Sequence, residues 1–417
     1  MPTTAQGALA GIKVLDLSRV LAGPWATQML ADLGADVIKV ERPLAGDDTR
    51  HWGPPFLKDA QGNDTRDASY FTACNRNKRS ITVDMAHPEG QALLRRMAQE
   101  ADVVVENFKV GGLRQYGLDY DSLKALNPRL VYCSITGFGQ DGPYAERAGY
   151  DLMVQAMCGL MSITGHADNQ PGGGPLKVGV AVIDVFTGLY ASNAILAALN
   201  ARDNVRNGSG EGQYIDMALL DVGMAVLANQ AAGYLATEQT PTRAGNIHPS
   251  LAPYQDFPTL DSNVLLAIGN DGQFARFCHA VGHAAWAQDP RFATNTARVQ
   301  NRDALLKLMQ PLMQTRSTAD WIALFEDKAV PCGPINTIAQ AFDDPQVRHR
   351  NIRQTLPCTK GDGMAEIATV ANPMRLSATP VQYRSAPPAL GEHTHEVLQA
   401  MGLDAEAIAR LQSRQVI

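Results

Sequence analysis

Residues 11–43 read GIKVLDLSRVLAGPWATQMLADLGADVIKVERP, and this stretch alternates between two hydrophobic patterns. The apolar run Gly11–Leu17 predicts a buried strand, and Asp36–Pro43 predicts a second one. Between them, Gly23–Ala35 has the pattern of a helix, with Pro24 near its start, where proline is tolerated. A helix that connects two buried strands indicates a parallel pair joined by a right-handed crossover.

The same alternation of strands and helices continues along the first third of the chain. Further strands are expected at Arg79–Met85, Asp102–Phe108 and Arg129–Gly139, with helices at His87–Ala101 and near Tyr120–Leu126. We therefore predict an α/β fold with a Rossmann-like large domain, built on a parallel sheet, and a smaller α+β domain. In such folds ligands bind at the carboxyl ends of the strands. The first strand is not followed by GxGxxG, which argues against a dinucleotide cofactor.

The length of 417 residues exceeds the size at which a single core usually stops growing, which favours two domains. The polar, glycine-rich segment Asn200–Gly212 is typical of a linker. We expect residues 1–205 to form the first part of the large domain and residues 206–335 to form the linker and the small domain. Residues 336–417 would then complete the large domain.

Composition and charge argue against several classes of protein. Hydrophobic residues make up 45% and charged residues 19% of the chain, as in a soluble globular protein. The net charge of −6 and the lack of a basic run argue against a nucleic-acid partner. No apolar run is long and uninterrupted enough to predict a membrane span. The six cysteines include no Cys-x-x-Cys pair and no secretory signal is visible, so we expect a cytoplasmic protein with reduced thiols.

Asp184 is the only charged residue in the stretch Val178–Asn200. Burying a lone carboxylate is costly unless it is paired or hydrogen-bonded. One interpretation is a helix N-cap, which would contribute about 1 kcal/mol to stability. The other is a nucleophile, because backbone N–H groups and the dipole at a helix start hold a carboxylate ionised without a separate base. The two interpretations are compatible.

Other catalytic and metal-binding motifs are missing from the sequence, which leaves Asp184 as the best candidate nucleophile. Neither a GxSxG nucleophile elbow nor an HExxH zinc motif occurs. His393 and His395 lack the acidic partner spacing of a metal site, and their position fits the start of a helix. We therefore predict no metal site.

Several stretches, in order along the chain, resemble the class III CoA-transferases, the group of carnitine CoA-transferase and formyl-CoA transferase. They are residues 11–43, NRNKRSITVDM (75–85), residues 101–151, VAVIDVFTGLYA (180–191), VPCGPINT (330–337) and PPALGEHTHEVL (387–398). The resemblance implies that Asp184 attacks an acyl-CoA thioester and forms a mixed anhydride, which the released CoA thiolate converts into an aspartyl-CoA thioester. The acceptor acid then takes over the CoA through a second anhydride.

The resemblance also implies which residues contact coenzyme A. They are Val20, Leu21, Arg42, Val83, Met85, Asn107, Phe108, Arg114, Arg147, Tyr150 and Asp151. The chain departs from the family near two of them, because the expected basic residue aligns with Gln115 and the expected lysine aligns with Ala148. Coenzyme A would be a substrate, with no permanently bound cofactor. The family forms interlocked, ring-like homodimers.

The same superfamily contains α-methylacyl-CoA racemases, which need a histidine in a GHD-like motif as a second proton-transfer group. Here the motif reads GYD, Gly149–Asp151, and the ordinary tyrosine pKa of about 10 makes Tyr150 a poor base at neutral pH. Transfer is therefore favoured over racemisation. A non-catalytic CoA-binding protein is a third alternative, which would not need an ionised acid in an apolar setting.

The loop RAGNIHPSLAPYQDF, residues 243–257, resembles transferases that move CoA from succinyl-CoA to a dicarboxylic acid such as glutarate, mesaconate, citramalate or itaconate. The resemblance implies a dicarboxylate acceptor, with His248 and Tyr254 as the residues that bind it. The expected partners are therefore an acyl-CoA, a small carboxylic acid and a second copy of the chain.

Overall fold

The computed structural model describes residues 7–358 and 366–417 and divides the chain into two compact units. The first unit comprises the described residues up to Leu160 together with Lys177–Glu238 and Arg348–Ile417. The second unit comprises Met161–Leu176 and Gln239–Val347. The chain just after residue 206 lies in the first unit, because strand β8 (Tyr214–Ala218) adds to its sheet.

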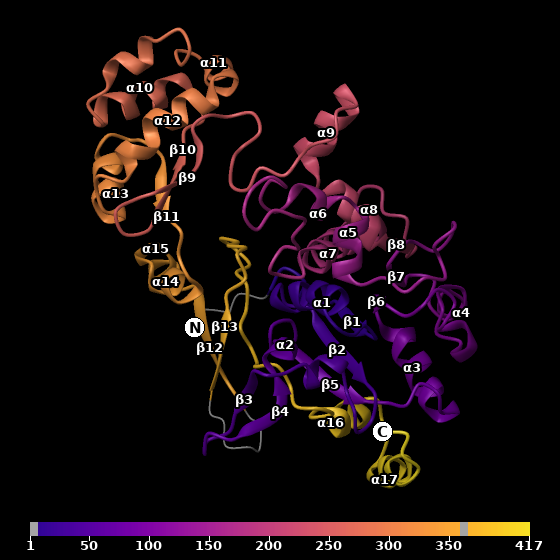
Figure 1. The fold of residues 1–417 in the computed structure, drawn as a ribbon. Coiled ribbons are helices and arrows are strands. Elements are labelled where there is room, and N and C mark those ends of the chain that lie inside the picture. Colours follow the sequence, from indigo (N-terminus) through magenta and orange to yellow (C-terminus); the bar gives the residue numbers. More distant parts are fainter. Residues whose placement is uncertain (1–6, 359–365) are drawn as a thin grey trace. The chain divides into compact units, whose positions relative to one another are not determined.

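The first unit is built on a six-stranded parallel sheet with the order β5-β2-β1-β6-β7-β8 (Figure 1). Its strands are β1 (Lys13–Asp16), β2 (Asp36–Glu41), β5 (Lys78–Thr82), β6 (Val103–Glu106), β7 (Val131–Thr136) and β8. The predicted parallel sheet is confirmed. On one side of β1 the order continues through β2 to β5, and on the other side it continues through β6 and β7 to β8. The strand order therefore reverses between β1 and β6. Ligands of open parallel sheets bind at such a reversal, outside the carboxyl ends of the strands.

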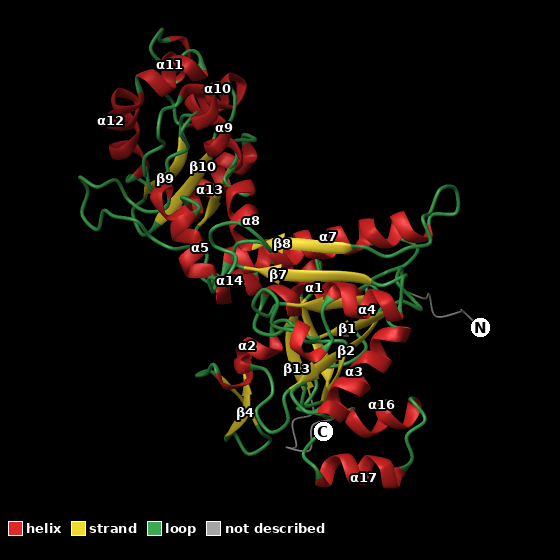
Figure 2. Ribbon diagram, turned by 90° about the vertical axis from the view of Figure 1, so that its right-hand side faces the viewer, coloured by secondary structure: helices red, strands yellow, loops and turns green. Residues whose placement is uncertain are grey.

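Helices cover both faces of this sheet (Figure 2). One face carries α1 (Ala22–Asp32) and α7 (Val182–Asp203), and the other carries α3 (Pro88–Glu100) and α4 (Tyr120–Leu126). This arrangement follows from the inner strands β1, β6 and β7, which place apolar side chains on both faces and therefore need cover on both sides.

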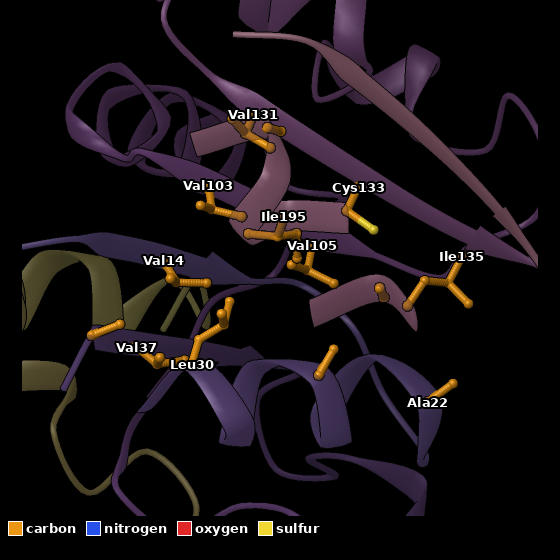
Figure 3. Packing of buried hydrophobic residues seen from close by; sticks show 14 of the residues in the cluster. Val14, Ala22, Leu30, Val37, Val103, Val105, Val131, Cys133, Ile135 and Ile195 are labelled. Atoms are coloured by element: carbon orange, nitrogen blue, oxygen red, sulfur yellow. The ribbon is translucent and has the colours of Figure 1, made fainter. Parts of the chain in front are cut away.

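Side-chain alternation along β6 distributes its valines between the two cores. Val103 and Val105 belong to the core under α1 and α7, whereas Val104 belongs to the core under α3 and α4. Figure 3 shows the first core, in which Leu30 of α1 and Ile195 of α7 lie among the valines of the sheet. This core holds α1 and α7 on the same face of the sheet.

The helix α7 is long and apolar enough to cross a bilayer. Its residues Ile183, Ala191 and Ile195 are buried against the sheet. The helices α8 (Leu219–Ala225) and α9 (Ala228–Thr237), bent by 74° relative to each other, are together also long and apolar enough. Such helices are weak evidence for a membrane protein.

The end of the chain returns to the edge strand β5 of the sheet. The N–H of His393 donates to the carbonyl of Ser80 at 2.9 Å, and the N–H of Thr82 donates to Oγ1 of Thr394 at 3.0 Å. These bonds attach the start of α16 to β5.

The other elements of this unit are β3 (Phe56–Lys58), β4 (Asp64–Ala68), α2 (Ser69–Thr72), α5 (Asp151–Met157), β12 (Arg353–Pro357), β13 (Glu366–Val370), α16 (Thr394–Ala400), α17 (Ala405–Ser413) and the short 3₁₀ helices Asp48–His51 and Arg114–Tyr116.

The second unit combines an antiparallel sheet with helices. Its strands follow the order β11-β10-β9 and comprise Cys332–Pro334, Asn263–Ala267 and Tyr254–Pro258. Buried aromatic side chains, including Phe277 and Trp321, fill the core between the sheet and the helices. The helices are α10 (Asp271–Ala280), the 3₁₀ helix Ala284–Gln288, α11 (Asn295–Gln300), α12 (Arg302–Met313), α13 (Thr318–Asp327) and α14 (Ile338–Asp343), while α6 (Leu160–Ile163) and α15 (Pro345–His349) lie where the chain passes between units.

Candidate active site

The carboxyl ends of β1, β6 and β7 border a cavity of about 400 Å³ in the first unit. It lies at the reversal of the strand order, where open parallel sheets bind their ligands. Many of the residues predicted from the sequence line this cavity, namely Val20, Leu21, Asn107, Phe108, Arg147, Tyr150 and Asp184. The fold therefore brings together segments that lie far apart in the sequence.

Asp184 lies in the first turn of α7, two residues after the helix begins at Val182. Its side chain is partly buried and lines the cavity. No hydrogen bond reaches its carboxylate from the residues that the structure describes. The carboxylate is thus not the cap of its own helix, and its oxygens are free to react.

Asp151 provides the cap instead, from the first turn of α5. Its Oδ1 accepts the N–H groups of Ile183 at 2.8 Å and of Asp184 at 3.3 Å. Its Oδ2 accepts a hydrogen bond of 2.5 Å from Nε2 of Gln155, whose Oε1 in turn accepts the N–H of Val178 at 2.9 Å. Asp151 does not line the cavity, and its contacts orient the start of α7.

Burial, followed by the charge of Asp151, raises the pKa of Asp184 to about 7. The prediction that the helix start would hold this carboxylate ionised is therefore wrong. The reason is that Asp151 already accepts the first N–H groups of α7 and adds a second negative charge nearby. Near neutral pH both the acid and the carboxylate forms of Asp184 are populated, and the carboxylate is the nucleophilic form.

The other predicted coenzyme-A residues do not line this cavity. Arg42 and Met85 line a neighbouring cavity of about 140 Å³, to which Phe108 also contributes. Arg114 lines a third cavity, of about 440 Å³, which shares Lys109 with the first. Val83 is only 1% exposed and belongs to the core under α3, so its side chain can contact no ligand.

His248 and Tyr254 belong to the second unit. Their rings lie 5.0 Å apart, and Nδ1 of His248 accepts the N–H of Ser250 at 3.1 Å. The two rings are therefore neighbours, although Tyr254 begins strand β9 and does not lie in the loop that the sequence predicted for residues 243–257.

Positive charge lines the cavity at Arg19, Lys109 and Arg147. Arg19 is paired with Asp48 at 2.7 Å. The guanidinium of Arg147 lies 4.4 Å from the ring centre of Tyr144, and no carboxylate among the described residues pairs with it. A stacked guanidinium without a counter-ion is suited to bind an anionic group of a ligand.

Sequence reasoning missed several of the lining residues, including Trp52, Asp48 and Lys109. Lys109 directly follows Phe108 at the end of β6, so its position in the sequence could have identified it. Asp48 and Trp52 carry no such signal, because they reach the cavity through a 3₁₀ turn far from the other lining segments.

The comparisons with known proteins agree with one another. The model of CoA-transferase family III matches residues 9–394. The chain is 53% identical to a succinate–glutarate CoA-transferase of Agrobacterium fabrum, over 94% of each chain. It is 40% identical to the succinyl-CoA:glutarate CoA-transferase of Homo sapiens, over 98% of this chain and 90% of the relative. A solved structure, a CaiB/BaiF family protein from Brucella suis, is 50% identical with a TM-score of 0.82 and covers 95% of this chain and 100% of its own.

Proposed function

Because this chain belongs to CoA-transferase family III, we propose that it moves CoA from succinyl-CoA to a dicarboxylic acid, through covalent intermediates on Asp184. The observation that carries the proposal is an Asp184 carboxylate without a hydrogen-bond donor among the described residues, in a cavity at the carboxyl ends of the strands. The names of the relatives support the substrates, since they include transferases of glutarate, D-citramalate and mesaconate. Glutarate is the first acceptor to test.

In the proposed reaction the Asp184 carboxylate attacks the succinyl-CoA carbonyl, the C–S bond breaks, and a succinyl-aspartyl anhydride and CoA thiolate result. The thiolate attacks the aspartyl carbonyl and expels succinate, leaving CoA on Asp184 as a thioester. The acceptor carboxylate then displaces the thiolate and forms a second anhydride. Finally, the thiolate attacks the acceptor's carbonyl, which gives the new acyl-CoA and frees Asp184. No net proton is taken up, so the site needs no general base.

The surroundings of Asp184 suit this sequence of steps. Arg147 and Lys109 supply positive charge to a cavity that must hold an anionic thioester and an anionic acceptor. Apolar neighbours such as Leu21 and Ile135 restrict the access of water, which would hydrolyse the anhydride.

The binding of coenzyme A belongs to the same proposal. Val20, Leu21 and Phe108 would contact it in the cavity, and Arg42 and Met85 would extend the site into the neighbouring cavity. Asn107 also lines the cavity, but both ends of its amide bind the backbone of Arg19. His248 and Tyr254 would bind the distal carboxylate of the acceptor. An interlocked homodimer in the cytoplasm, with coenzyme A as substrate and no permanent cofactor, completes the proposal.

Trapping of the covalent intermediate tests this function directly. The protein is incubated with succinyl-CoA, treated with hydroxylamine or borohydride, and analysed by peptide mass spectrometry. A transferase is expected to be labelled at Asp184 and to yield glutaryl-CoA when glutarate is added. Exchange of the α-proton of a branched acyl-CoA without a label would indicate a racemase instead, and bound CoA without either signal would indicate a non-catalytic binding protein.

A further inference from the structure

The loop Ser18–Val20, between β1 and α1, is held by side chains along its whole length. The N–H of Ser18 donates to Oδ1 of Asp16 at 3.0 Å, and its carbonyl accepts a bond of 2.9 Å from Nζ of Lys39. The next residue, Arg19, is held by Asn107. The N–H of Arg19 donates to Oδ1 of Asn107 at 3.0 Å, and Nδ2 of Asn107 donates back to the carbonyl of Arg19 at 2.7 Å.

Val20 has an unfavourable backbone conformation, with φ at +70°. This left-handed region is rare for a β-branched residue and is strained, so it persists only where the surroundings impose it. Here the Val20 N–H lies 3.2 Å from both carboxylate oxygens of Asp47. The Sγ of Cys74 donates to the carbonyl of Val20 at 3.7 Å.

Asp47 is itself anchored by a buried ion pair. Its Oδ2 lies 2.8 Å from Nζ of Lys39, and both side chains are only 1% exposed. Burial opposes the ionisation of Asp47, but the charge of Lys39 outweighs it and holds the pKa of Asp47 below its ordinary value. Since Lys39 also binds the carbonyl of Ser18, one buried pair holds both ends of the loop.

The loop lies beside the face of α7 that carries Asp184. Val20 and Asp184 line the same cavity. Gly188 follows Asp184 by one helical turn on the same face of α7. At Gly188 the helices α1 and α7 approach so closely that an added β-carbon would lie 2.7 Å from the carbonyl oxygen of Ala22. The start of α1, and with it the preceding loop, is thus fixed next to the candidate nucleophile.

We propose that Asp47 and Asn107 are positioning residues for acyl transfer, which hold Val20 in its left-handed conformation and thereby preform the cavity wall beside Asp184. The inference rests on the proposed function. It also gives the Asn107 amide a different role from direct contact with coenzyme A, because both ends of that amide already bind the backbone of Arg19. A cavity wall that is fixed before substrate binds does not have to be ordered in the transition state. Variants that free this wall are therefore expected to have a lower kcat.

The test uses the full-length protein and a double-mutant cycle between Asp47→Asn and Val20→Gly. Asp47→Asn is expected to lower kcat about 10- to 100-fold with a smaller change in KM, because a shift of the wall by an ångström suffices for such a loss. Glycine adopts the left-handed conformation without strain. The double variant is therefore expected to recover most of the kcat that Asp47→Asn loses, which a merely structural role of Asp47 would not produce.

Asn107→Ala is a second variant that leaves the buried pair intact, in case Asp47→Asn does not fold. It is expected to lower kcat about tenfold or more, for the same reason. Asp36→Asn is the matched control, because Asp36 pairs with Arg79 at 2.6 Å at the opposite ends of the strands and should leave kcat unchanged. Folded fraction is measured for each variant by circular dichroism.

The outcomes separate the two proposals. Unchanged kcat per folded protein in Asn107→Ala, or equal losses from Asp47→Asn with and without Val20→Gly, would overturn the positioning role. Absence of transfer and of an Asp184 label in the unaltered protein would overturn the proposed function instead.

Discussion

Asp151 and Asp184 meet at the first turn of α7, where Oδ1 of Asp151 accepts the N–H of Asp184 at 3.3 Å. The contact fixes the backbone under the candidate nucleophile. It also places a second acid next to it, and this charge, after burial, raises the pKa of Asp184 to about 7. One residue therefore sets both the position and the charge state of the other.

The first prediction concerns the pH dependence of catalysis. Because the carboxylate is the nucleophilic form, kcat/KM for succinyl-CoA should rise with pH to a plateau, with a midpoint near the Asp184 pKa of about 7. Asp151→Asn removes one negative charge, so the pKa of Asp184 falls and the midpoint should shift to lower pH. Initial rates between pH 5 and 9 measure this shift. Asp221→Asn, at the start of α8 and outside the cavity, is the control, and a midpoint that does not move in Asp151→Asn would contradict the coupling.

The second prediction concerns stability. The pKa of Asp184 in the folded chain lies above the ordinary value of 3.8, so the folded state binds more protons than the unfolded state between these two values. The contribution of Asp184 to stability therefore falls as the pH rises from about 4 to about 7. Asn cannot ionise, so Asp184→Asn should raise Tm relative to the unaltered protein more at pH 8 than at pH 4.5. Differential scanning fluorimetry at both pH values measures this, and a Tm difference independent of pH would count against the raised pKa.

The third prediction concerns Arg147, whose guanidinium lies over Tyr144 without a carboxylate partner in the described part of the chain. If it binds an anionic group of coenzyme A, Arg147→Gln should raise KM for succinyl-CoA about 10- to 100-fold, the loss expected for a hydrogen bond between charged groups. Steady-state kinetics with each substrate varied in turn measures the effect. Arg129→Gln, which removes the Arg129 pair with Asp203 outside the cavity, is the control. A rise in KM for glutarate alone would reassign Arg147 to the acceptor.

The parallel sheet could be predicted from the sequence because its signals are local. Apolar runs mark β1 and β2 within residues 11–43, and ligands of parallel sheets bind at the carboxyl ends of such strands. The strand order, which reverses between β1 and β6, emerged only in the structure. The cap of α7 could not be predicted, since Asp151 precedes Asp184 by 33 residues. The conformation of Val20 also leaves no trace in the sequence, because glycine, not valine, signals a positive φ. It depends on Asp47, which only the folded chain places behind the loop.

The last prediction concerns the contact between α1 and α7 beneath the site. A β-carbon on Gly188 would lie 2.7 Å from the carbonyl oxygen of Ala22 and 2.9 Å from Cβ of Trp25. Both distances are shorter than van der Waals contact allows. Gly188→Ala should therefore push the helices apart, destabilise the protein by about 1–3 kcal/mol, and lower kcat by displacing the start of α1 from Asp184.

Gly233→Ala is the matched control for this variant, because Gly233 lies inside helix α9 with no atom within 4 Å of an added β-carbon. Alanine is the better helix former by about 1 kcal/mol, so this control should be neutral or stabilising. Urea unfolding followed by circular dichroism compares the two variants, and transfer rates are taken on the folded protein. If Gly188→Ala matched Gly233→Ala in both stability and rate, the close approach of α1 and α7 would not constrain the site. A loss of stability and of transfer rate in Gly188→Ala alone would instead show that the geometry at Asp184 depends on the helix contact at Gly188, one turn along α7.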